Sequence, residues 1–211
     1  MKRLAILGAS GHGKVVAEIA ELLGWSVVFF DDAYPSVSKL EVWQVIGKTE
    51  DLLKNLDDFD GCFIAIGNND IRLEKYELLD KHGVTLPCLI HPMAIVSRYA
   101  KISSGTVVMA GVVVNPFVKI DECCILNTAC TLDHDCVVEP GVHVSPGVNL
   151  AGAVRIGQGS WIGIGANVKQ CIEIGENVVV GAGAVVIENI PNNVVAVGVP
   201  ARVKNKMSYK C

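Results

Sequence analysis

Residues 126–156 read LNTACTLDHDCVVEPGVHVSPGVNLAGAVRI and decide the fold of the C-terminal half of the chain. Every sixth residue of this stretch is Leu, Ile or Val. The same phase extends in both directions, so that fifteen consecutive aliphatic residues stand at positions 102, 108, 114, 120, 126, 132, 138, 144, 150, 156, 162, 168, 174, 180 and 186. A fixed period sustained over this length predicts an architecture of stacked repeats, each of which packs on its neighbours.

Each hexad predicts one short strand and one turn of a parallel β-helix. Three hexads close a triangular coil, so fifteen hexads predict five coils and a column on the order of 24 Å long. The aliphatic residues would point inward and form the core. A small or β-branched residue follows four positions after most of them. Cys124, Cys130 and Cys136 take that place in three successive hexads, which predicts buried thiols that act as small apolar side chains.

The N-terminal half has a different pattern, in which short apolar runs alternate with segments whose apolar residues recur at the helical spacing. Buried strands are expected at 3–7, 27–30, 62–66 and 86–90, with helices at 14–23 and 70–82. Apolar strands separated by helices predict a parallel sheet covered on both faces. The predicted fold class is therefore an α/β Rossmann-like domain over residues 1–92, followed by an all-β domain of parallel β-helix over residues 93–211.

Composition narrows the choice of partners and compartment. The formal net charge of −4 and the isoelectric point near 5.7 argue against a nucleic-acid groove or an anionic membrane surface. The apolar runs are far shorter than the roughly 20 residues that span a bilayer. Eight cysteines without a C-x-x-C pair and without an export signal favour reduced thiols and a cytoplasmic location.

One histidine stands out inside the repeat. His134 follows the inward Leu132 by two residues, which places it at an outward corner, and Asp133 and Asp135 flank it. A neighbouring carboxylate makes an imidazole more basic and selects its tautomer. Gly152 lies one coil later and leaves room over the ring. This pattern makes His134 a candidate general base, and the plain alternative is a surface histidine in a turn.

The N-terminal half carries a glycine-rich loop, Gly8–Gly13, between its first strand and first helix. A helix N-terminus at that place binds anions such as a diphosphate. The glycines stand at 8, 11 and 13, whereas the dinucleotide fingerprint requires 8, 10 and 13, so the spacing argues against NAD. Asp31 and Asp32 end the second strand, where a carboxylate can accept hydrogen bonds from a ribose or a base; the plain alternative is a solvated strand end.

Several motifs occur in one order along the chain, and together they resemble the PglD/NeuD-type sugar acetyltransferase family of hexapeptide-repeat acyltransferases. The resemblance covers nearly the whole chain. It is nearest to the members that acetylate a UDP-4-amino-sugar in bacillosamine synthesis. The matching motifs are Gly8-Ala9-Ser10-Gly11-His12-Gly13, Asp31-Asp32, Ile66-Gly67-Asn68-Asn69, the hexads, Leu126-Asn127-Thr128, Asp133-His134-Asp135 and Gly198-Val199-Pro200-Ala201-Arg202.

The resemblance implies a left-handed β-helix, a homotrimer, acetyl-CoA as cosubstrate and no metal. It implies acetyl transfer to the 4-amino group of a UDP-amino-sugar of the UDP-N-acetylbacillosamine type. His134 would be the general base, and Asp135 stands where the family usually has Glu. The remaining implied contacts are His143, Arg155, Ile164 and Ala182 with acetyl-CoA, and Ser10, Gly11, His12, Asp31, Asp32 and Gly67 with the nucleotide sugar.

Other functions remain open on the sequence alone. The nearest rival is O-acetylation of a sugar such as sialic acid, because the same scaffold serves both reactions. A γ-type carbonic anhydrase also uses hexapeptide coils, but it needs three imidazoles around one zinc ion, and only His134 and His143 lie inside the repeat. A non-catalytic scaffold is the remaining alternative.

Overall fold

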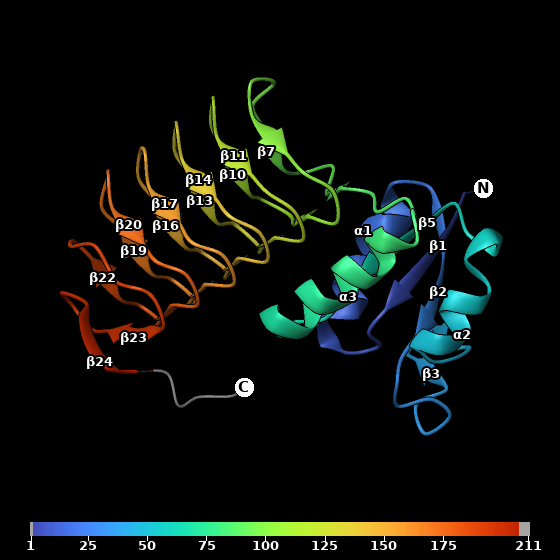
Figure 1. The fold of residues 1–211 in the computed structure, drawn as a ribbon. Helices are drawn as coiled ribbons and strands as arrows, with labels where there is room; N and C mark the ends of the chain where they lie inside the picture. The colour runs from blue at the N-terminus through green and yellow to red at the C-terminus, as the bar shows by residue number, and fades with distance from the viewer. Residues whose placement is uncertain (1, 207–211) are drawn as a thin grey trace. The chain divides into compact units, whose positions relative to one another are not determined.

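The computed structural model of the chain describes residues 2–206. Its contacts divide the chain into two compact units, Met1–Pro92 and Met93–Cys211. The first is an α/β unit and the second is built almost entirely from short strands (Figure 1).

The first unit is a small parallel sheet with helical connections. Strands β1 (Lys2–Leu7), β2 (Trp25–Phe30) and β5 (Gly61–Ile64) pair in the order β2-β1-β5. Helix α1 (Gly11–Leu22) joins β1 to β2, and helix α3 (Asn69–Lys81) follows β5. Leu4, Ala5, Ile6 and Leu7 are all buried, so both faces of the central strand are covered, as predicted.

The prediction of a fourth sheet strand over residues 86–90 was wrong. Only Leu89–Ile90 forms a strand, β6, and it lies outside the β2-β1-β5 sheet. The chain does run beside β5 for one step, because the N–H of Cys62 donates to the carbonyl of Thr85 at 2.9 Å. A parallel ladder would next need the N–H of residue 87, which is Pro87 and has none.

Residues 31–60 hold short elements that the sequence patterns did not predict. A two-stranded antiparallel hairpin pairs β3 with β4, and a short α-helix and a 3-10 turn follow it. Their bounds are β3 (Lys39–Leu40), β4 (Trp43–Gln44), α2 (Thr49–Lys54) and η1 (Leu56–Asp58).

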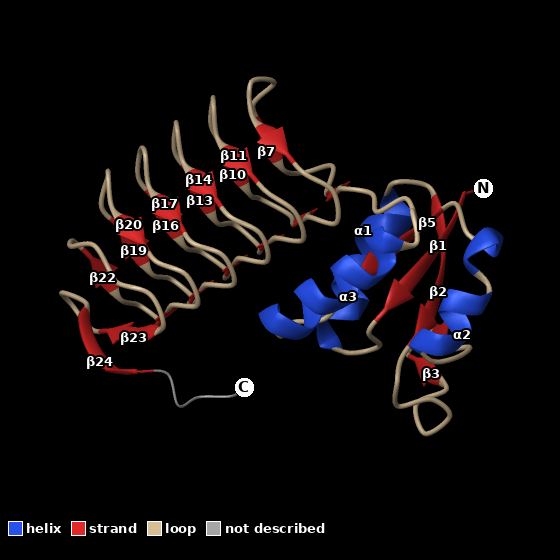
Figure 2. Cartoon of the chain, in the orientation of Figure 1, coloured by secondary structure: helices blue, strands red, loops and turns tan. Residues whose placement is uncertain are grey.

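The second unit consists of two-residue strands at a constant spacing of six residues (Figure 2). The second residue of every strand from β8 to β22 is one of the fifteen predicted aliphatic positions, and β7 adds one strand before them. The strands are β7 (Ile95–Val96), β8 (Lys101–Ile102), β9 (Val107–Val108), β10 (Val113–Val114), β11 (Lys119–Ile120), β12 (Ile125–Leu126), β13 (Thr131–Leu132), β14 (Val137–Val138), β15 (His143–Val144), β16 (Asn149–Leu150), β17 (Arg155–Ile156), β18 (Trp161–Ile162), β19 (Asn167–Val168), β20 (Glu173–Ile174), β21 (Val179–Val180) and β22 (Val185–Val186).

Pairing between these strands confirms the 18-residue coil. In the parallel pair of β10 and β13, Val113 faces Thr131 and Val114 faces Leu132. Three sheets result, which we name after one member each. They are the β13 sheet (β22-β19-β16-β13-β10-β7), the β14 sheet (β20-β17-β14-β11-β8) and the β15 sheet, which contains β21-β18-β15-β12-β9 and continues from β21 into β23 (Val194–Val197) and β24 (Arg202–Lys206). The predicted fold class, a Rossmann-like α/β unit followed by a parallel β-helix, is confirmed.

The interior of the coils is mostly apolar. Leu132, Val138 and Val144 are completely buried, and so are Cys130 and Cys136 at the predicted inward position. Burial raises the pKa of the Cys130 thiol to about 12 and that of the Cys136 thiol to about 11. These thiols are therefore protonated at neutral pH and serve the packing rather than nucleophilic chemistry.

The corners between the strands share one backbone conformation. A residue with positive φ stands at every sixth position, for example Gly105 at 67°, Phe117 at 64° and Asp135 at 61°. Glycine adopts this left-handed conformation freely, whereas a residue with a β-carbon loses about 1–2 kcal/mol there. Each side chain at such a corner therefore lowers the stability of the fold unless its packing compensates, and one that does not pack is retained for function.

The column ends with an irregular coil. Val180 of β21 pairs with Ala196 of β23 (Val194–Val197), a separation of 16 residues instead of 18. Strand β24 (Arg202–Lys206) then folds back antiparallel to β23. The antiparallel pairing covers the open edge of the last coil, where unpaired backbone groups would otherwise recruit another chain.

Candidate active site

His134 lies at a corner of the column, between β13 and β14. Leu132 anchors this corner because its side chain is completely buried in the core. The backbone N–H of His134 donates to Oδ1 of Asp133 at 2.8 Å, and the His134 side chain is 60% exposed. We name this corner and its counterparts in neighbouring coils, between the β13 and β14 sheets, the His134 edge. The imidazole is thus held by its backbone and presented outward, as predicted.

Asp135 contacts the imidazole directly. Its Oδ2 lies 2.8 Å from Nδ1 of His134. A neutral ring that places its proton on Nδ1 toward this carboxylate leaves the lone pair of Nε2 available to accept a proton. The hydrogen bond that the ring donates to Asp135, followed by the charge of Asp133, raises the pKa of His134 above its ordinary value. The shorter Asp at this position therefore reaches the ring without a bridging water.

A further polar contact supports the corner from the preceding coil. Nδ2 of Asn115 donates to Oδ1 of Asp133 at 2.9 Å. The backbone N–H of His134 and then this amide lower the pKa of Asp133 and keep it ionised. Sequence reasoning missed Asn115, although its position 18 residues before Asp133 was a usable signal.

Gly152 lies directly against the imidazole. A Cβ at this glycine would stand 2.7 Å from both Cε1 and Nε2 of His134. The N–H of Ala153 also donates to the carbonyl of His134 at 2.9 Å, which fixes the two coils in register. The ring itself therefore occupies the room that the absent side chain leaves, where the sequence had predicted open space above it.

We expect an Asp135→Asn substitution to move the acidic limb of the rate profile to lower pH. The neutral imidazole is the active form of a general base, and the first cause of its raised pKa is the hydrogen bond to Asp135. Without that carboxylate, His134 loses its proton at lower pH. The measurement is kcat/KM for acetyl transfer between pH 5 and 9. An unmoved limb would show that His134 does not carry this titration.

His143 lies on the outer face of the β15 sheet, away from the His134 edge. Its ring stacks on Trp161 in the next coil, with centroids 5.8 Å apart and an interplanar angle of 7°. Nδ2 of Asn127 lies 3.2 Å from its Nε2. The stack on Trp161 and the contact with Asn127 hold the His143 ring in one orientation, with Nε2 near the corner that contains Asn127.

The other residues implied as acetyl-CoA contacts are spread over the column. Ile164 and Ala182 lie at successive corners between the β15 and β13 sheets, which is a different edge from that of His134. Arg155 starts β17 in the β14 sheet and faces Glu173 across the ladder. A surface hollow of about 560 Å³ beside Arg155 is lined also by Glu139, Glu173 and Glu176. These carboxylates make the surroundings of Arg155 less favourable for phosphate than the sequence alone indicated.

In the first unit, the glycine-rich loop is held close to the end of β2. Ser10 precedes α1 in an extended conformation, and Gly13 approaches the loop so closely that a Cβ there would lie 2.6 Å from the carbonyl oxygen of Gly8. By contrast, a Cβ at Gly11 or at Gly67 would meet nothing within 4 Å. These two glycines leave open backbone at the carboxyl end of the sheet, where α/β folds bind their ligands.

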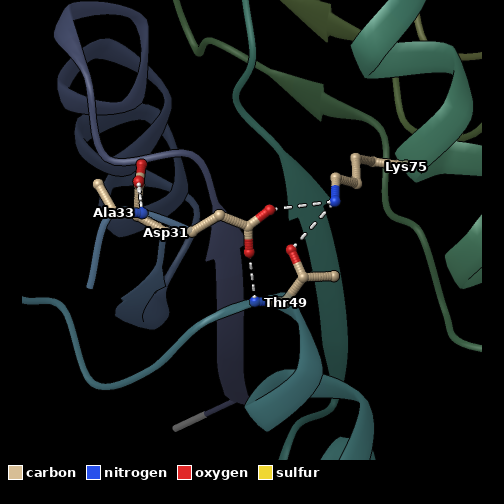
Figure 3. A network of polar contacts seen from close by, with 5 residues as sticks. Asp31, Ala33, Thr49 and Lys75 are labelled. Atoms are coloured by element: carbon tan, nitrogen blue, oxygen red, sulfur yellow. Dashed lines mark hydrogen bonds and ion pairs between the residues drawn. The ribbon is translucent and has the colours of Figure 1, made fainter. Parts of the chain in front are cut away.

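Asp31 and Asp32 already have protein partners. Oδ2 of Asp31 accepts from the N–H of Ala9 at 2.7 Å, and its Oδ1 accepts from the N–H of Ala33 at 2.9 Å. Oδ1 of Asp32 accepts from the N–H of Thr49 at 2.9 Å, and its Oδ2 lies 3.2 Å from Nζ of Lys75. Figure 3 shows Asp31 with Ala33, and Thr49 beside Lys75. Asp31 thereby ties the glycine loop to β2. Each carboxylate oxygen retains a second lone pair for a ligand hydroxyl.

His12 is partly buried at the start of α1, and its Nε2 atom is buried. Its Nε2 has no hydrogen-bond partner among residues 2–206. Burial, and then the charge of Arg72, lower the pKa of His12 from 6.5 to about 4. Arg72 is itself buried, and its guanidinium donates to the carbonyls of Ile66 and Gly67 at 3.0 and 3.1 Å. A buried polar atom without a partner marks a place where a ligand can supply the missing hydrogen bond.

The sequence analysis missed Arg72 and Lys75. Both lie on α3, three residues apart, so they face the same side of the helix. Their signal in the sequence was two cationic residues one turn into a helix that follows a buried strand and a glycine. They bring positive charge to the carboxyl end of the sheet, where the anion site was expected.

We expect a His12→Gln substitution to remove part of the pH dependence of stability. The unfolded chain binds a proton on His12 below about pH 6.5, whereas the folded protein resists it down to about pH 4. Stability is therefore lost as the pH falls through this window, by about 2 kcal/mol from pH 7 to pH 5. Urea unfolding of both proteins at the two pH values measures it, with His82→Gln at an exposed helix end as control. An equal loss in the His12→Gln variant would contradict this assignment.

Within residues 2–206, no group of three or more His, Cys, Asp or Glu side chains is arranged to hold a metal ion. None of the helices in that range is both long and apolar enough to span a bilayer.

Both units of the chain match models of known protein families. Residues 3–79 match the family model of the PglD N-terminal domain, and residues 153–188 match the model of the bacterial transferase hexapeptide with six repeats. Among curated proteins, UDP-N-acetylbacillosamine N-acetyltransferase of Bacillus subtilis is 38% identical over 112 residues. That match covers 52% of this chain and 52% of the relative, so the chain aligns with about half of the relative's length.

Two solved structures match along almost the whole chain. The acetyltransferase domain of PglB from Neisseria gonorrhoeae is 43% identical, covers 97% of this chain and is itself covered to 100%, with a TM-score of 0.92. PerB from Caulobacter crescentus, in complex with CoA and GDP-perosamine, is 34% identical with coverages of 97% and 98% and a TM-score of 0.92. The PglB domain is also known in complex with acetyl coenzyme A. With these matches, this chain belongs to the PglD-type family of sugar acetyltransferases.

Proposed function

We propose that this protein transfers the acetyl group of acetyl-CoA to the 4-amino group of a nucleotide-linked amino sugar of the UDP-N-acetylbacillosamine type. The observation that carries this proposal is the His134–Asp135 pair, with 2.8 Å between Nδ1 and Oδ2, presented at an exposed corner beside Gly152. A base of this kind activates an amine, and two of the relatives compared above, the Bacillus subtilis enzyme and PerB, act on or bind amino sugars.

In the proposed reaction, the sugar amine attacks the carbonyl carbon of the acetyl thioester. The new C–N bond forms while Nε2 of His134 takes the proton from the amine. The C–S bond then breaks, and CoA leaves as a thiolate that can receive this proton from the imidazolium. Asp135 holds the ring and stabilises its charged form. The proton thus passes from amine to sulfur through one side chain.

A backbone N–H at the His134 edge can support the developing oxyanion. The N–H of Gly152 has no hydrogen-bond partner among residues 2–206. It stands on the glycine that contacts the imidazole, and a donor so placed stabilises negative charge as it forms on the thioester oxygen. A glycine at this site keeps that N–H open to the substrate.

Different residues are assigned to each of the two substrates. For acetyl-CoA we assign His143, Arg155, Ile164 and Ala182, as the family pattern implies. For the nucleotide sugar we assign Ser10, Gly11, His12, Asp31, Asp32 and Gly67, supported by the partnerless Nε2 of His12 and by the cationic Arg72 and Lys75 at that end of the sheet.

The placement of these residues supports a homotrimer. His134 and the pair of Ile164 and Ala182 lie on different edges of the same column. One acetyl-CoA molecule therefore meets both groups most readily when a second copy brings its own edge alongside, and a closed three-fold ring lets every copy do so. Light scattering at micromolar concentration tests this, and a monomer would contradict it. The free thiols of Cys130 and Cys136 suit a reducing compartment, so we place the reaction in the cytoplasm.

An acceptor panel tests the function. Purified protein is incubated with acetyl-CoA and UDP-linked 4-amino sugars, GDP-linked and dTDP-linked amino sugars, or free sialic acid, and the released CoA thiol is measured. Mass spectrometry then locates the acetyl group. We expect turnover on a UDP-4-amino-sugar with acetyl on nitrogen. Turnover confined to a hydroxyl acceptor would replace the proposal by sugar O-acetylation.

A further inference from the structure

A stacked aromatic pair lies exposed on the His134 edge. The rings of Tyr99 and Phe117 have centroids 5.6 Å apart and an interplanar angle of 26°. Both side chains are open to solvent, Tyr99 at 60% and Phe117 at 59%. The two residues stand 18 residues apart, in successive coils of one corner column. Exposed aromatic rings are costly in water, and a pair of them marks a surface that another molecule covers.

The backbone shows that the fold does not need a ring at this corner. Phe117 has φ of 64°, in the left-handed region that bulky side chains avoid. Glycine takes the same corner position at Gly105, Gly111 and Gly141 with similar φ. The phenyl ring is therefore kept against the local conformational preference, and since it is exposed it does not repay that cost by filling the core.

The pair lies immediately before the candidate base along the column. The N–H of Asp135 donates to the carbonyl of Pro116 at 3.3 Å, and the amide of Asn115 donates to Asp133 at 2.9 Å. Residues 115–117 thus lie under residues 133–135, one coil apart. The Tyr99–Phe117 pair therefore lies in the coils directly before the His134–Asp135 pair.

The residues assigned to acetyl-CoA leave this side of His134 to the acceptor. His143, Arg155, Ile164 and Ala182 all follow His134 along the column, so the donor approaches from the later coils. The amine must reach a face of the thioester carbonyl beside His134, and the earlier coils are the side that no assigned acetyl-CoA contact occupies. Phe117 and Tyr99 lie on that side.

We propose that Phe117, backed by Tyr99, is an acceptor-positioning residue against which the pyranose ring of the sugar stacks. The inference rests on the proposed function. The C–H groups on one face of a pyranose carry slight positive charge and meet the negative face of an aromatic ring favourably. Stacking would set the distance of the amine from Nε2 of His134 without any hydrogen bond to the reacting group.

The test is a Phe117→Gly substitution, which removes the ring and restores the residue that the corner prefers. We expect the KM for the acceptor to rise about tenfold, while kcat, the KM for acetyl-CoA and the melting temperature do not fall. Phe117→Tyr should restore the wild-type KM, because it keeps the ring face. Asn177→Gly, a left-handed residue at another edge with φ of 52°, is the matched backbone control and should leave the acceptor KM unchanged.

Each outcome of this experiment bears on the inference. An unchanged acceptor KM in Phe117→Gly overturns it. A change in oligomeric state by light scattering, with both KM values altered together, overturns it in favour of an interface between copies. If the wild-type protein acetylates only hydroxyl acceptors, the proposed function fails, but stacking is still tested by the KM of that sugar. If it acetylates no sugar at all, both proposals fall.

Discussion

The His134→Asn variant should lose about 10³-fold in kcat, because general-base catalysis by a positioned side chain contributes on the order of 10²–10⁴-fold. Asparagine retains a polar side chain of similar reach but has no basic lone pair at neutral pH. The attacking amine would then have to lose its proton to water. Steady-state kinetics with saturating acetyl-CoA and acceptor measures the loss.

Stability and donor binding should remain at the wild-type level in this variant. The His134 side chain is 60% exposed and contributes nothing to the buried core. The melting temperature and the affinity for acetyl-CoA, measured by calorimetry, therefore serve as internal controls. His82→Asn, at the exposed end of α3 in the other unit, should retain wild-type turnover. A His134→Asn variant with near wild-type kcat would remove the proposed mechanism.

The Gly152→Ala variant should show the second-largest effect, a loss of about 10²-fold in kcat, since a small misplacement of a catalytic group costs this much. The added methyl group would stand 2.7 Å from Cε1 and Nε2 of His134. Such a contact is impossible, so the ring must rotate away from the Nδ1–Asp135 hydrogen bond or the coil must shift. Either movement takes Nε2 from its place beside the N–H of Gly152.

A matched control separates this steric effect from a general effect on the column. Gln170→Ala truncates the side chain at the corresponding position of the same edge one coil later to a methyl group, and should leave kcat unchanged because residue 170 is two coils away from His134. The imidazole titration of each variant, followed by NMR, should show a lowered pKa only for Gly152→Ala, because only there is the bond to Asp135 broken. If Gly152→Ala retained full turnover, the observed ring position would not be the catalytic one.

Much of the fold followed from periodicity. A period of six over fifteen aliphatic residues leaves one way to bury them all, a coil of three faces, and the pairing of Val114 with Leu132 bears this out. The inward place of Cys130 and the outward place of His134 follow from the same phase. The sequence alone was enough to predict these orientations because each hexad repeats the same backbone geometry.

Non-repeating regions were harder to predict. The expected strand over 86–90 failed because Pro87 cannot donate the next ladder hydrogen bond, and residues 31–60 contain short elements with no period to reveal them. The structure also changed the interpretation of two residues that were expected to contact a ligand. Asp31 and Asp32 were expected to face a ligand, yet both already bind backbone N–H groups, and Asp32 also pairs with Lys75.

The sequence by itself determined the two-part architecture, the phase of the solenoid and the identity of the candidate base, because these depend on residue spacing along one chain. Only the tertiary structure decided the contacts themselves: across coils, the Asn115–Asp133 hydrogen bond, the imidazole filling the space at Gly152 and the Tyr99–Phe117 stack. Within the first unit it decided that the charge of Arg72 lies near His12. Such contacts join residues far apart in sequence, and their distances depend on how side chains settle into the space left by neighbouring turns, which no local pattern encodes.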